Sequence, residues 1–431
     1  MKLKSFTLTL LTVCLAAVIG PKAASAATFS VIADGLDNPR NIGFGPDGSL
    51  YVTESGRGGD GADGRCIPSP SAGYIPLCAA QNGSLSKINL DGTKTTIISN
   101  LTSLALSPSG EQAAGPADIK FDDKGNAYLL TGLAGDPTNR DTILQGPDLG
   151  QLYKVDLNTG ALTSLADFAA YETNNNPDGT DLISNPYALA IKGDIGYVVD
   201  GGGNTIYSVG LDGSGIKNVA AFPLKVIDRD KLEYPDLGPD VDPSALPVTQ
   251  QSVPTGIAVA PDGSLTVSEY TYFPYPEGEA RVFKVNGDDL SIQTIADGFT
   301  QLTGVAYDPE GNLYVLQHIN TSEWKEIQQG GIITGDISGS LIKIAADGTR
   351  TTVWKGDGLE AASGITYYDG SLYISNRARL AGTGQVIKID PNARKIPESG
   401  SAIGLIAIGA LGATSMIKRK RSKELVKAEI A

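Results

Sequence analysis

The stretch "NPRNIGFGPDGSLYVTESG" (residues 38–56) contains an apolar run, a Pro-Asp-Gly turn and a second apolar run. Alternating apolar residues on both sides of a glycine-containing turn are typical of a β-hairpin. Similar sequences recur further along the chain, in copies that begin at residues 115, 185, 253, 301 and 361. A hairpin that recurs in this way indicates a repeat protein.

A second hairpin follows most copies, as in "GSLSKINLDGTKTTIIS" (83–99) and "GSLIKIAADGTRTTVWK" (339–355). Units of four strands, repeated along the chain, are typical of propeller blades. The last copy has only three strands, and "TFSVIADGLDNP" (28–39) has the form of the missing outer strand. We therefore predict an all-β fold over 27–392, a six-bladed β-propeller closed by an N-terminal strand that completes the last blade. A pair of β-sandwiches is the alternative, but it does not predict equivalent hairpins.

Both ends of the chain lie outside this repeat. Residues 1–26 combine Lys2 and Lys4, an apolar run and a final Ala-Ser-Ala, which is the pattern of a secretory signal peptide. In the tail, 393–431, Pro397-Glu398 precedes an apolar transmembrane-like segment (402–417) and a basic cluster (418–421). This tail resembles the PEP-CTERM sorting signals of exported bacterial proteins, and a simple membrane anchor is the alternative. We expect an exported protein, periplasmic or at the cell surface, that contacts the membrane or cell surface through its tail.

Charge and cysteine content limit the partners and the chemistry. The formal net charge is −14, which repels nucleic acid, so we expect no nucleic-acid partner. Cys66 and Cys78 lie in one glycine-rich loop, "GRCIPSPSAGYIPLCA". Neighbouring cysteines usually pair outside the cytoplasm, and we predict a disulfide between them. A metal-binding or redox-active pair is the alternative.

The long connections of the predicted propeller all fall on one face. Strand direction alternates within a blade, so the links between its second and third strands lie on the same face as the links between blades. These links are long at 55–82, 132–149, 169–184, 223–252, 270–279 and 318–338, whereas the other turns are tight. A rigid scaffold with one elaborated face usually carries its function there.

Glu54 ends the second strand of its hairpin, near the predicted channel mouth on this face. The equivalent residues are Thr131, Asp200, Glu269, Gln317 and Asn376. Hard cations bind clustered carboxylates, and three converging carboxylates repel one another unless a cation enters. We therefore predict that Glu54, Asp200 and Glu269 bind Ca²⁺ or Mg²⁺, with the amides and the hydroxyl as neutral ligands. A solvated channel mouth is the alternative.

Other candidate ligand-binding residues lie beside this predicted ring. "EYTYFPYPEGEA" (269–280) supplies Tyr270, Tyr272, Phe273 and Tyr275, which together suit a flat, partly apolar ligand. His318 is the only histidine, and it is a candidate base, although a packed histidine is the alternative. The sequence carries no nucleotide, haem or zinc signature and no serine-hydrolase motif, so it identifies no catalytic residue.

The combination of "NPRNIGFGPDGSLYVTESGRGG" (38–59), "NNNPDGTDLISNPYALA" (174–190) and "VPTGIAVAPDGSLTVSEYTYFPYPEGEARVFKV" (253–285) resembles the ScyD/ScyE family over essentially all of 28–390. This family is associated with biosynthesis of scytonemin, an indole–phenol pigment of cyanobacterial sheaths. The resemblance implies an exported propeller that takes part in late assembly of the pigment, where monomeric units are joined oxidatively. It transfers no catalytic residue.

More distantly, the hairpins are similar to NHL-repeat and SMP-30/gluconolactonase propellers, of which the latter are divalent-metal lactonases. In this chain Arg40-Asn41 stands where we expect the acidic metal ligand of that family. Three hypotheses follow. The first is a propeller that binds a small aromatic metabolite and takes part in its oxidative coupling. The second is a metal-dependent lactonase or related hydrolase. The third is a non-catalytic binding or scaffold protein outside the cytoplasm.

Overall fold

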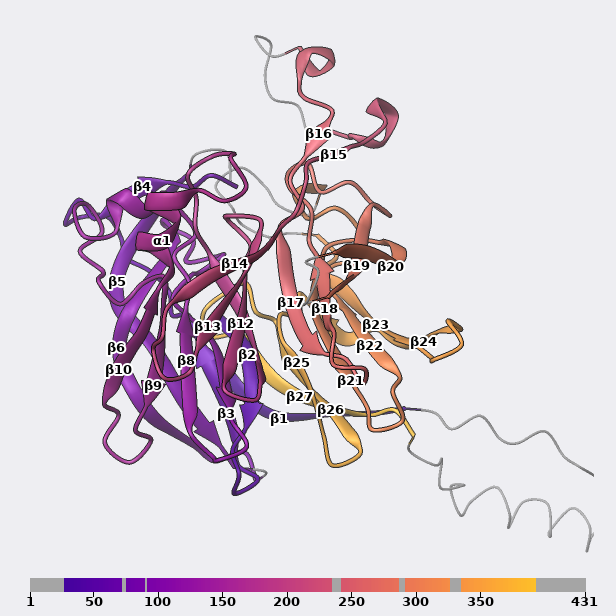
Figure 1. The fold of residues 1–431 in the computed structure, drawn as a ribbon, viewed down its shortest axis with the longest axis horizontal. Helices are drawn as coiled ribbons and strands as arrows, with labels where there is room; N and C mark the ends of the chain where they lie inside the picture. Colours follow the sequence, from indigo (N-terminus) through magenta and orange to yellow (C-terminus); the bar gives the residue numbers. More distant parts are fainter. Residues whose placement is uncertain are drawn as a thin grey trace, which may run out of the picture. The chain divides into compact units, whose positions relative to one another are not determined.

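The computed structural model describes residues 27–71, 75–89, 91–234, 242–286, 291–325 and 335–392. Residues 27–391 form one compact unit, shown in Figure 1. The predicted signal peptide and tail lie outside the described residues. Within the residues that are described, no helix is long and apolar enough to span a membrane.

Six antiparallel sheets of four or five strands follow one another along the described part of the chain, and we call them blades 1 to 6. Blade 1 contains β2 (Pro39–Phe44), β3 (Leu50–Glu54), β4 (Cys66–Pro68), β5 (Pro76–Ile88) and β6 (Lys94–Leu106). Blade 2 contains β7 (Pro116–Phe121), β8 (Ala127–Thr131), β9 (Gln151–Val155) and β10 (Leu162–Asp167). Blade 3 contains β11 (Pro186–Lys192), β12 (Ile195–Asp200), β13 (Thr205–Gly210) and β14 (Ile216–Ala221).

The remaining blades repeat this order. Blade 4 contains β17 (Pro254–Val259), β18 (Leu265–Glu269), β19 (Ala280–Val285) and β20 (Ile292–Phe299). Blade 5 contains β21 (Leu302–Tyr307), β22 (Leu313–Gln317), β23 (Ser338–Ile344) and β24 (Arg350–Glu360). Blade 6 contains β25 (Ile365–Tyr368), β26 (Ser371–Asn376) and β27 (Gly384–Asp390), and β1 (Thr28–Leu36) is its outer strand.

The first strands of the blades surround a common axis. β2 contacts β7, the contacts continue through β11, β17 and β21 to β25, and β25 contacts β2 again. Side chains also connect the blades around this axis: the Asn41 amide of β2 donates to the carbonyls of Ala117 in β7 (3.2 Å) and Tyr187 in β11 (3.0 Å), and the Thr303 hydroxyl of β21 donates to that of Ala362, just before β25 (2.9 Å). These contacts make the structure a closed all-β propeller, which confirms the predicted fold class.

The hydrophobic core is divided into layers between adjacent blades. One layer combines Val199 and Ile206 of blade 3 with Val267 and Phe283 of blade 4, and comparable clusters fill the other blade interfaces. Alternation along each strand produces this arrangement, because successive side chains point to opposite faces of a sheet and both faces are covered by neighbouring blades. Each blade is therefore held mainly by the two beside it.

The N-terminal strand closes the propeller as predicted. β1 pairs antiparallel with β27, with Phe29 opposite Ile389 and Val31 opposite Ile387. Leu36 is fully buried in the layer between blades 6 and 1. The strand therefore removes the exposed edge of blade 6 and also contributes to the core.

The elaborated face carries short elements of its own, at the upper end of the molecule in Figure 1. They include α1 (Phe168–Asn175), which follows blade 2 and is capped by the Asp167 carboxylate, and the small sheet of β15 (Lys225–Val226) and β16 (Thr249–Gln250). Single 3₁₀ turns occur at Pro137–Asn139, Arg229–Lys231, Pro243–Ala245 and Glu323–Lys325. The predicted disulfide between Cys66 and Cys78 is confirmed, and it joins β4 to β5 on this face.

Truncation of Leu36 tests the closure. We expect Leu36→Ala to lower the free energy of unfolding by about 2–5 kcal/mol, because it leaves a cavity in the layer that joins the two ends of the propeller. Val31→Thr in the same strand is the control: Val31 is 48% exposed, and its substitution should change stability by less than about 0.5 kcal/mol. Urea denaturation measures both, and equal effects of the two variants would contradict the closure.

Candidate functional site: an axial cavity on the elaborated face

The six residues of the predicted ring occupy equivalent places, because each is the last residue of the second strand of its blade. These strands are β3, β8, β12, β18, β22 and β26. All six side chains are buried or nearly so, and none of them lines the cavity on the axis. The alignment of the repeats therefore located the positions correctly, but the expected direction of the side chains was wrong.

In five of the six blades a side-chain oxygen of this residue instead holds the link that enters the blade, whereas the Thr131 hydroxyl of blade 2 donates to the Asp148 carbonyl (2.6 Å). In four blades a backbone N–H of that link donates to the side chain: Asp37 to Glu54 (2.9 Å), Asn185 to Asp200 (2.6 Å), Thr300 to Gln317 (3.0 Å) and Glu360 to Asn376 (2.8 Å). In blade 4 the Ser252 hydroxyl donates to Glu269 (2.7 Å). Carboxylates and amides share an acceptor oxygen, which explains why both occur at this position.

The three carboxylates are satisfied separately, each within its own blade. Lys94 pairs with Glu54 at 2.7 Å, and Arg281 forms a two-point contact with Glu269 at 2.6 and 2.8 Å. Asp200 has no basic partner among the described residues. Burial raises the pKa of its carboxyl, while four donors, including the N–H groups of Gly202 and Gly203, oppose that effect.

A shared divalent cation does not fit this arrangement. Within the described residues, no group of three or more acidic, histidine or cysteine side chains is placed to share a metal ion. The predicted convergence of Glu54, Asp200 and Glu269 is therefore wrong. Its physical reason is the period of an extended strand, in which the residue after the ring position, and not the ring position itself, points toward the axis.

That following residue lines the axial cavity in five blades: Ser55, Gly132, Gly201, Tyr270 and His318. Each donates its backbone N–H to the incoming link, as Tyr270 does to the Val253 carbonyl (2.9 Å) and His318 to that of Gln301 (2.9 Å). In blade 6 the equivalent Arg377 instead forms an ion pair with Glu360 (2.9 Å). At this position small residues of blades 1 to 3 therefore leave space, while blades 4 and 5 supply a tyrosine and a histidine side chain.

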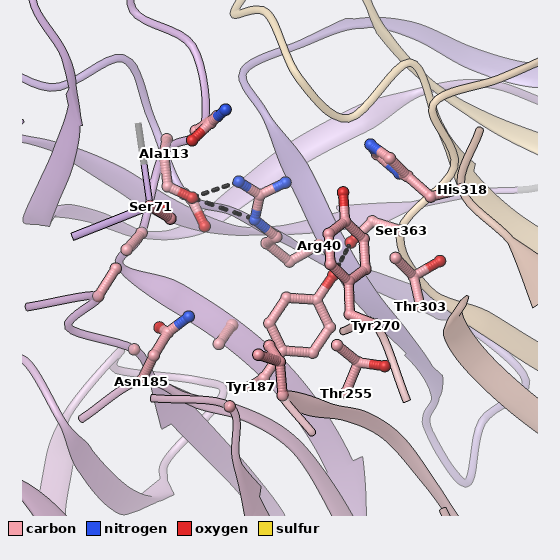
Figure 2. A pocket seen from close by; sticks show the side chains of 18 of the residues that line it. Arg40, Ser71, Ala113, Asn185, Tyr187, Thr255, Tyr270, Thr303, His318 and Ser363 are labelled. Atoms are coloured by element: carbon pink, nitrogen blue, oxygen red, sulfur yellow. Dashed lines mark hydrogen bonds between the residues drawn. The ribbon is translucent and has the colours of Figure 1, made fainter. Parts of the chain in front are cut away.

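The cavity has a volume of about 190 Å³. Figure 2 shows Arg40, Tyr187, Tyr270 and His318 around it. Of the aromatic candidates from the sequence, Tyr270, Tyr272 and Tyr275 line the cavity, and so does His318. Phe273 is not among the lining residues, and its ring packs against Tyr234 and Tyr275 at centroid distances of 5.8 and 6.0 Å.

Hydrogen bonds fix the tyrosines of the cavity. The Tyr270 hydroxyl donates to Glu323 (2.6 Å), that of Tyr272 to the Pro70 carbonyl (2.7 Å) and that of Tyr275 to the Ser71 carbonyl (3.2 Å). Burial raises the pKa of Tyr270 and of Tyr275 well above the ordinary value, and the Glu323 charge adds to this effect. Both are therefore neutral phenols at physiological pH, with rings held in fixed positions.

His318 presents an acceptor to the cavity. Its Nδ1 lies 2.7 Å from the Ala362 carbonyl and must be the protonated nitrogen, because a carbonyl can only accept. Burial lowers the pKa of His318 to about 4, so the ring is neutral at pH 7. In this tautomer Nε2 is an acceptor, and no described residue donates to it. A ligand N–H or O–H group is a suitable partner.

A buried ion triad forms another part of the wall. Arg379 donates to Glu323 (2.7 Å) and to Glu111 (3.1 Å), and all three side chains are at most 5% exposed. The Gln112 amide also approaches Glu323, at 3.4 Å. Sequence reasoning missed this triad, because its members come from three separate connections and carry no local motif. Both carboxylates are engaged by the guanidinium and its neighbours, so they too do not fit as ligands of a divalent cation.

Arg40 enters the cavity from the start of β2, and it was noted in the sequence only as a departure from the lactonase pattern. Its guanidinium donates to the carbonyls of Ala113 (3.1 Å from Nε) and Ala378 (2.6 Å from Nη1), as Figure 2 shows for Ala113. Burial lowers the pKa of this guanidinium, and the nearby Arg379 contributes. Among the described residues no carboxylate pairs with Arg40.

Comparisons with known proteins show similarity of fold alone. No family model and no curated protein sequence matches the chain. A putative oxidoreductase (glucose dehydrogenase) of Thermus thermophilus aligns at 15% identity and a TM-score of 0.47 over 84% of this chain and 100% of that one. A putative gluconolactonase aligns at 13% and 0.45 over 86% and 94%. A streptogramin B lyase aligns at 12% and 0.43 over 86% and 99%.

Neutralisation of Glu269 tests the structural role of the strand-end carboxylates. We expect Glu269→Gln to destabilise the protein by about 2–3 kcal/mol, because it leaves Arg281 without its buried partner. Glu360→Gln is the matched control, since Glu360 is 30% exposed and Glu269 only 1%, and an exposed pair contributes at most about 1 kcal/mol. Thermal unfolding with and without Ca²⁺ measures both. A calcium-dependent stabilisation that Glu269→Gln abolishes would restore the cation-binding interpretation.

Proposed function

We propose that this protein binds a small aromatic molecule in the axial cavity. The observation that carries the proposal is the set of tyrosine rings beside a neutral histidine acceptor, assembled from several blades around one cavity. Tyr187 and Tyr270 both line the cavity, as Figure 2 shows, and the Tyr187 hydroxyl bonds to Ser363 at 2.7 Å. Aromatic rings held in this way favour a flat ligand that stacks on them or meets them edge to face.

The size of the cavity supports the same ligand class. Its volume of about 190 Å³ exceeds the roughly 150 Å³ of an apolar protein cavity that accommodates benzene. One or two rings with a polar substituent therefore match the space. The mixture of tyrosine faces with a few fixed polar groups is also typical of small-molecule sites.

A role in late scytonemin assembly outside the cytoplasm is the finer form of this proposal. It rests on the resemblance to the ScyD/ScyE family, and the cavity supports it through the aromatic ligand class that the pigment's precursors share. A metal-dependent lactonase is the weaker candidate. Such an enzyme needs a metal held by converging ligands, whereas Glu54, Asp200 and Glu269 lie in separate networks.

Ligand binding to two variants of Tyr270 tests the proposal. The probe is 4-hydroxyphenylacetate, and its saturated counterpart 4-hydroxycyclohexylacetate is the control for ring planarity. We expect the purified protein to prefer the aromatic compound, and Tyr270→Ala to weaken its binding about tenfold by removal of a stacking partner. Tyr270→Phe keeps the ring and loses only the bond to Glu323, so it should bind nearly as the wild type. Isothermal titration calorimetry measures the affinities, and equal affinity for the two compounds would contradict the proposal.

A further inference from the structure

We propose that Arg40 binds an anionic group of the ligand, so that the ligands of the cavity are aromatic acids. This inference rests on the proposed function and adds the chemical class of the substituent. It follows from the hydrogen bonds that Arg40 makes, from the charges around it and from its place relative to the tyrosines.

The guanidinium of Arg40 has N–H donors that no described protein group accepts. An arginine carries five N–H groups, and the described residues accept three of them: Nε and Nη2 donate to Ala113, and Nη1 donates to Ala378. Two N–H groups therefore remain without a protein acceptor, on a side chain that lines the cavity. The three occupied donors fix the orientation of the fork, which is the preorganisation that a carboxylate ligand requires.

The charge of Arg40 is also uncompensated. Its acceptors are neutral carbonyl oxygens, whereas Arg379 is bound to both Glu111 and Glu323. Arg379 moreover repels Arg40, and the nearby phenols of Tyr187 and Tyr270 are not ionised. A cation that is partly removed from water and lacks a counter-ion is costly, and a ligand anion would offset that cost. Among the described cavity-lining residues, Arg40 is the cation that has no ion-pair partner.

The cavity holds a cation, Arg40, and a hydrogen-bond acceptor, His318, that could contact the two polar ends of such a ligand. In Figure 2 the Arg40 guanidinium lies beside Ala113, and His318 lies beyond Tyr270. A carboxylate placed on Arg40 would therefore put the attached ring near Tyr187 and Tyr270. The far end of that ring would then approach Nε2 of His318, which accepts from a phenol or an indole N–H. The cavity thus suits an aromatic acid that carries a donor on its ring.

A simpler interpretation gives Arg40 only a structural role, since it connects blade 1 to the links at Ala113 and Ala378. That role predicts a loss of stability on substitution, but it predicts no discrimination between charged and neutral ligands. The two interpretations therefore differ in a measurable way.

The deciding experiment compares an acid with its neutral amide. The purified protein is titrated with 4-hydroxyphenylacetate and with 4-hydroxyphenylacetamide, which have nearly the same shape and differ in charge. We expect the acid to bind about 10- to 100-fold more tightly, as for a hydrogen-bonded charge pair. Arg40→Gln should remove this preference, so that the variant binds acid and amide about equally, whereas Arg40→Lys should retain part of it.

Each outcome decides between the proposals. Equal affinity of the wild type for acid and amide would overturn the role of Arg40 and leave aromatic binding standing. A preference for the acid that survives in a folded Arg40→Gln variant would also overturn it. If neither compound binds the wild type, the proposed function itself is wrong. Should Arg40→Gln fail to fold, Arg40→Lys decides instead: a reduced preference for the acid supports the role of Arg40, and an undiminished preference overturns it.

Discussion

In five of the six blades a side-chain oxygen at the end of the second strand holds the incoming link of the propeller. Four of the six equivalent residues accept a backbone N–H of that link, and Glu269 accepts a serine hydroxyl instead. These oxygens are buried, so the bonds are protected from water and costly to leave unmade. Because successive residues of a strand point to opposite sides, the next residue lines the axial cavity in four of these five blades. The cavity therefore depends on a contact that contains no ligand-binding residue.

The sequence allowed the fold to be predicted because the repeat is explicit. Recurrent hairpins indicated a propeller, the strand at 28–39 indicated its closure, and the two cysteines of the glycine-rich loop indicated a disulfide. Each of these features is local or depends on a pairing with an obvious partner. The strand-end positions were also predictable, since the alignment of the repeats gives the register of every copy.

The direction of the strand-end side chains could not be predicted from the alignment. A shift of one residue changes the face of a strand. Glu269 and Gln317 hold the incoming links, whereas the residues that follow them, Tyr270 and His318, line the cavity. Three carboxylates in equivalent places also gave a misleading signal, because acids and amides serve equally well as acceptors. Arg379, which joins residues from distant connections, had no sequence signal at all.

The chemical asymmetry of the cavity links the fold to the proposed ligand. Serine and glycine at the axis in blades 1 to 3 leave room, while tyrosine and histidine in blades 4 and 5 supply ring faces and an acceptor. In the buried triad two carboxylates face the single guanidinium of Arg379, so that cation is fully compensated, which leaves Arg40 as the positive group facing the space. Under the proposed function, a few different residues at equivalent positions of a repeated scaffold form the site for one ligand class.

A crystal structure with 4-bromophenylacetate bound tests the central claim most directly, because the anomalous signal of bromine locates the ligand. The account predicts a bromine peak in the axial cavity near His318, with the carboxylate of the ligand on the Arg40 guanidinium and its ring beside Tyr187 and Tyr270. A bromine peak elsewhere would contradict this placement. One such place is a separate cavity that is lined by aliphatic residues of the first strands, such as Leu189 and Ile257.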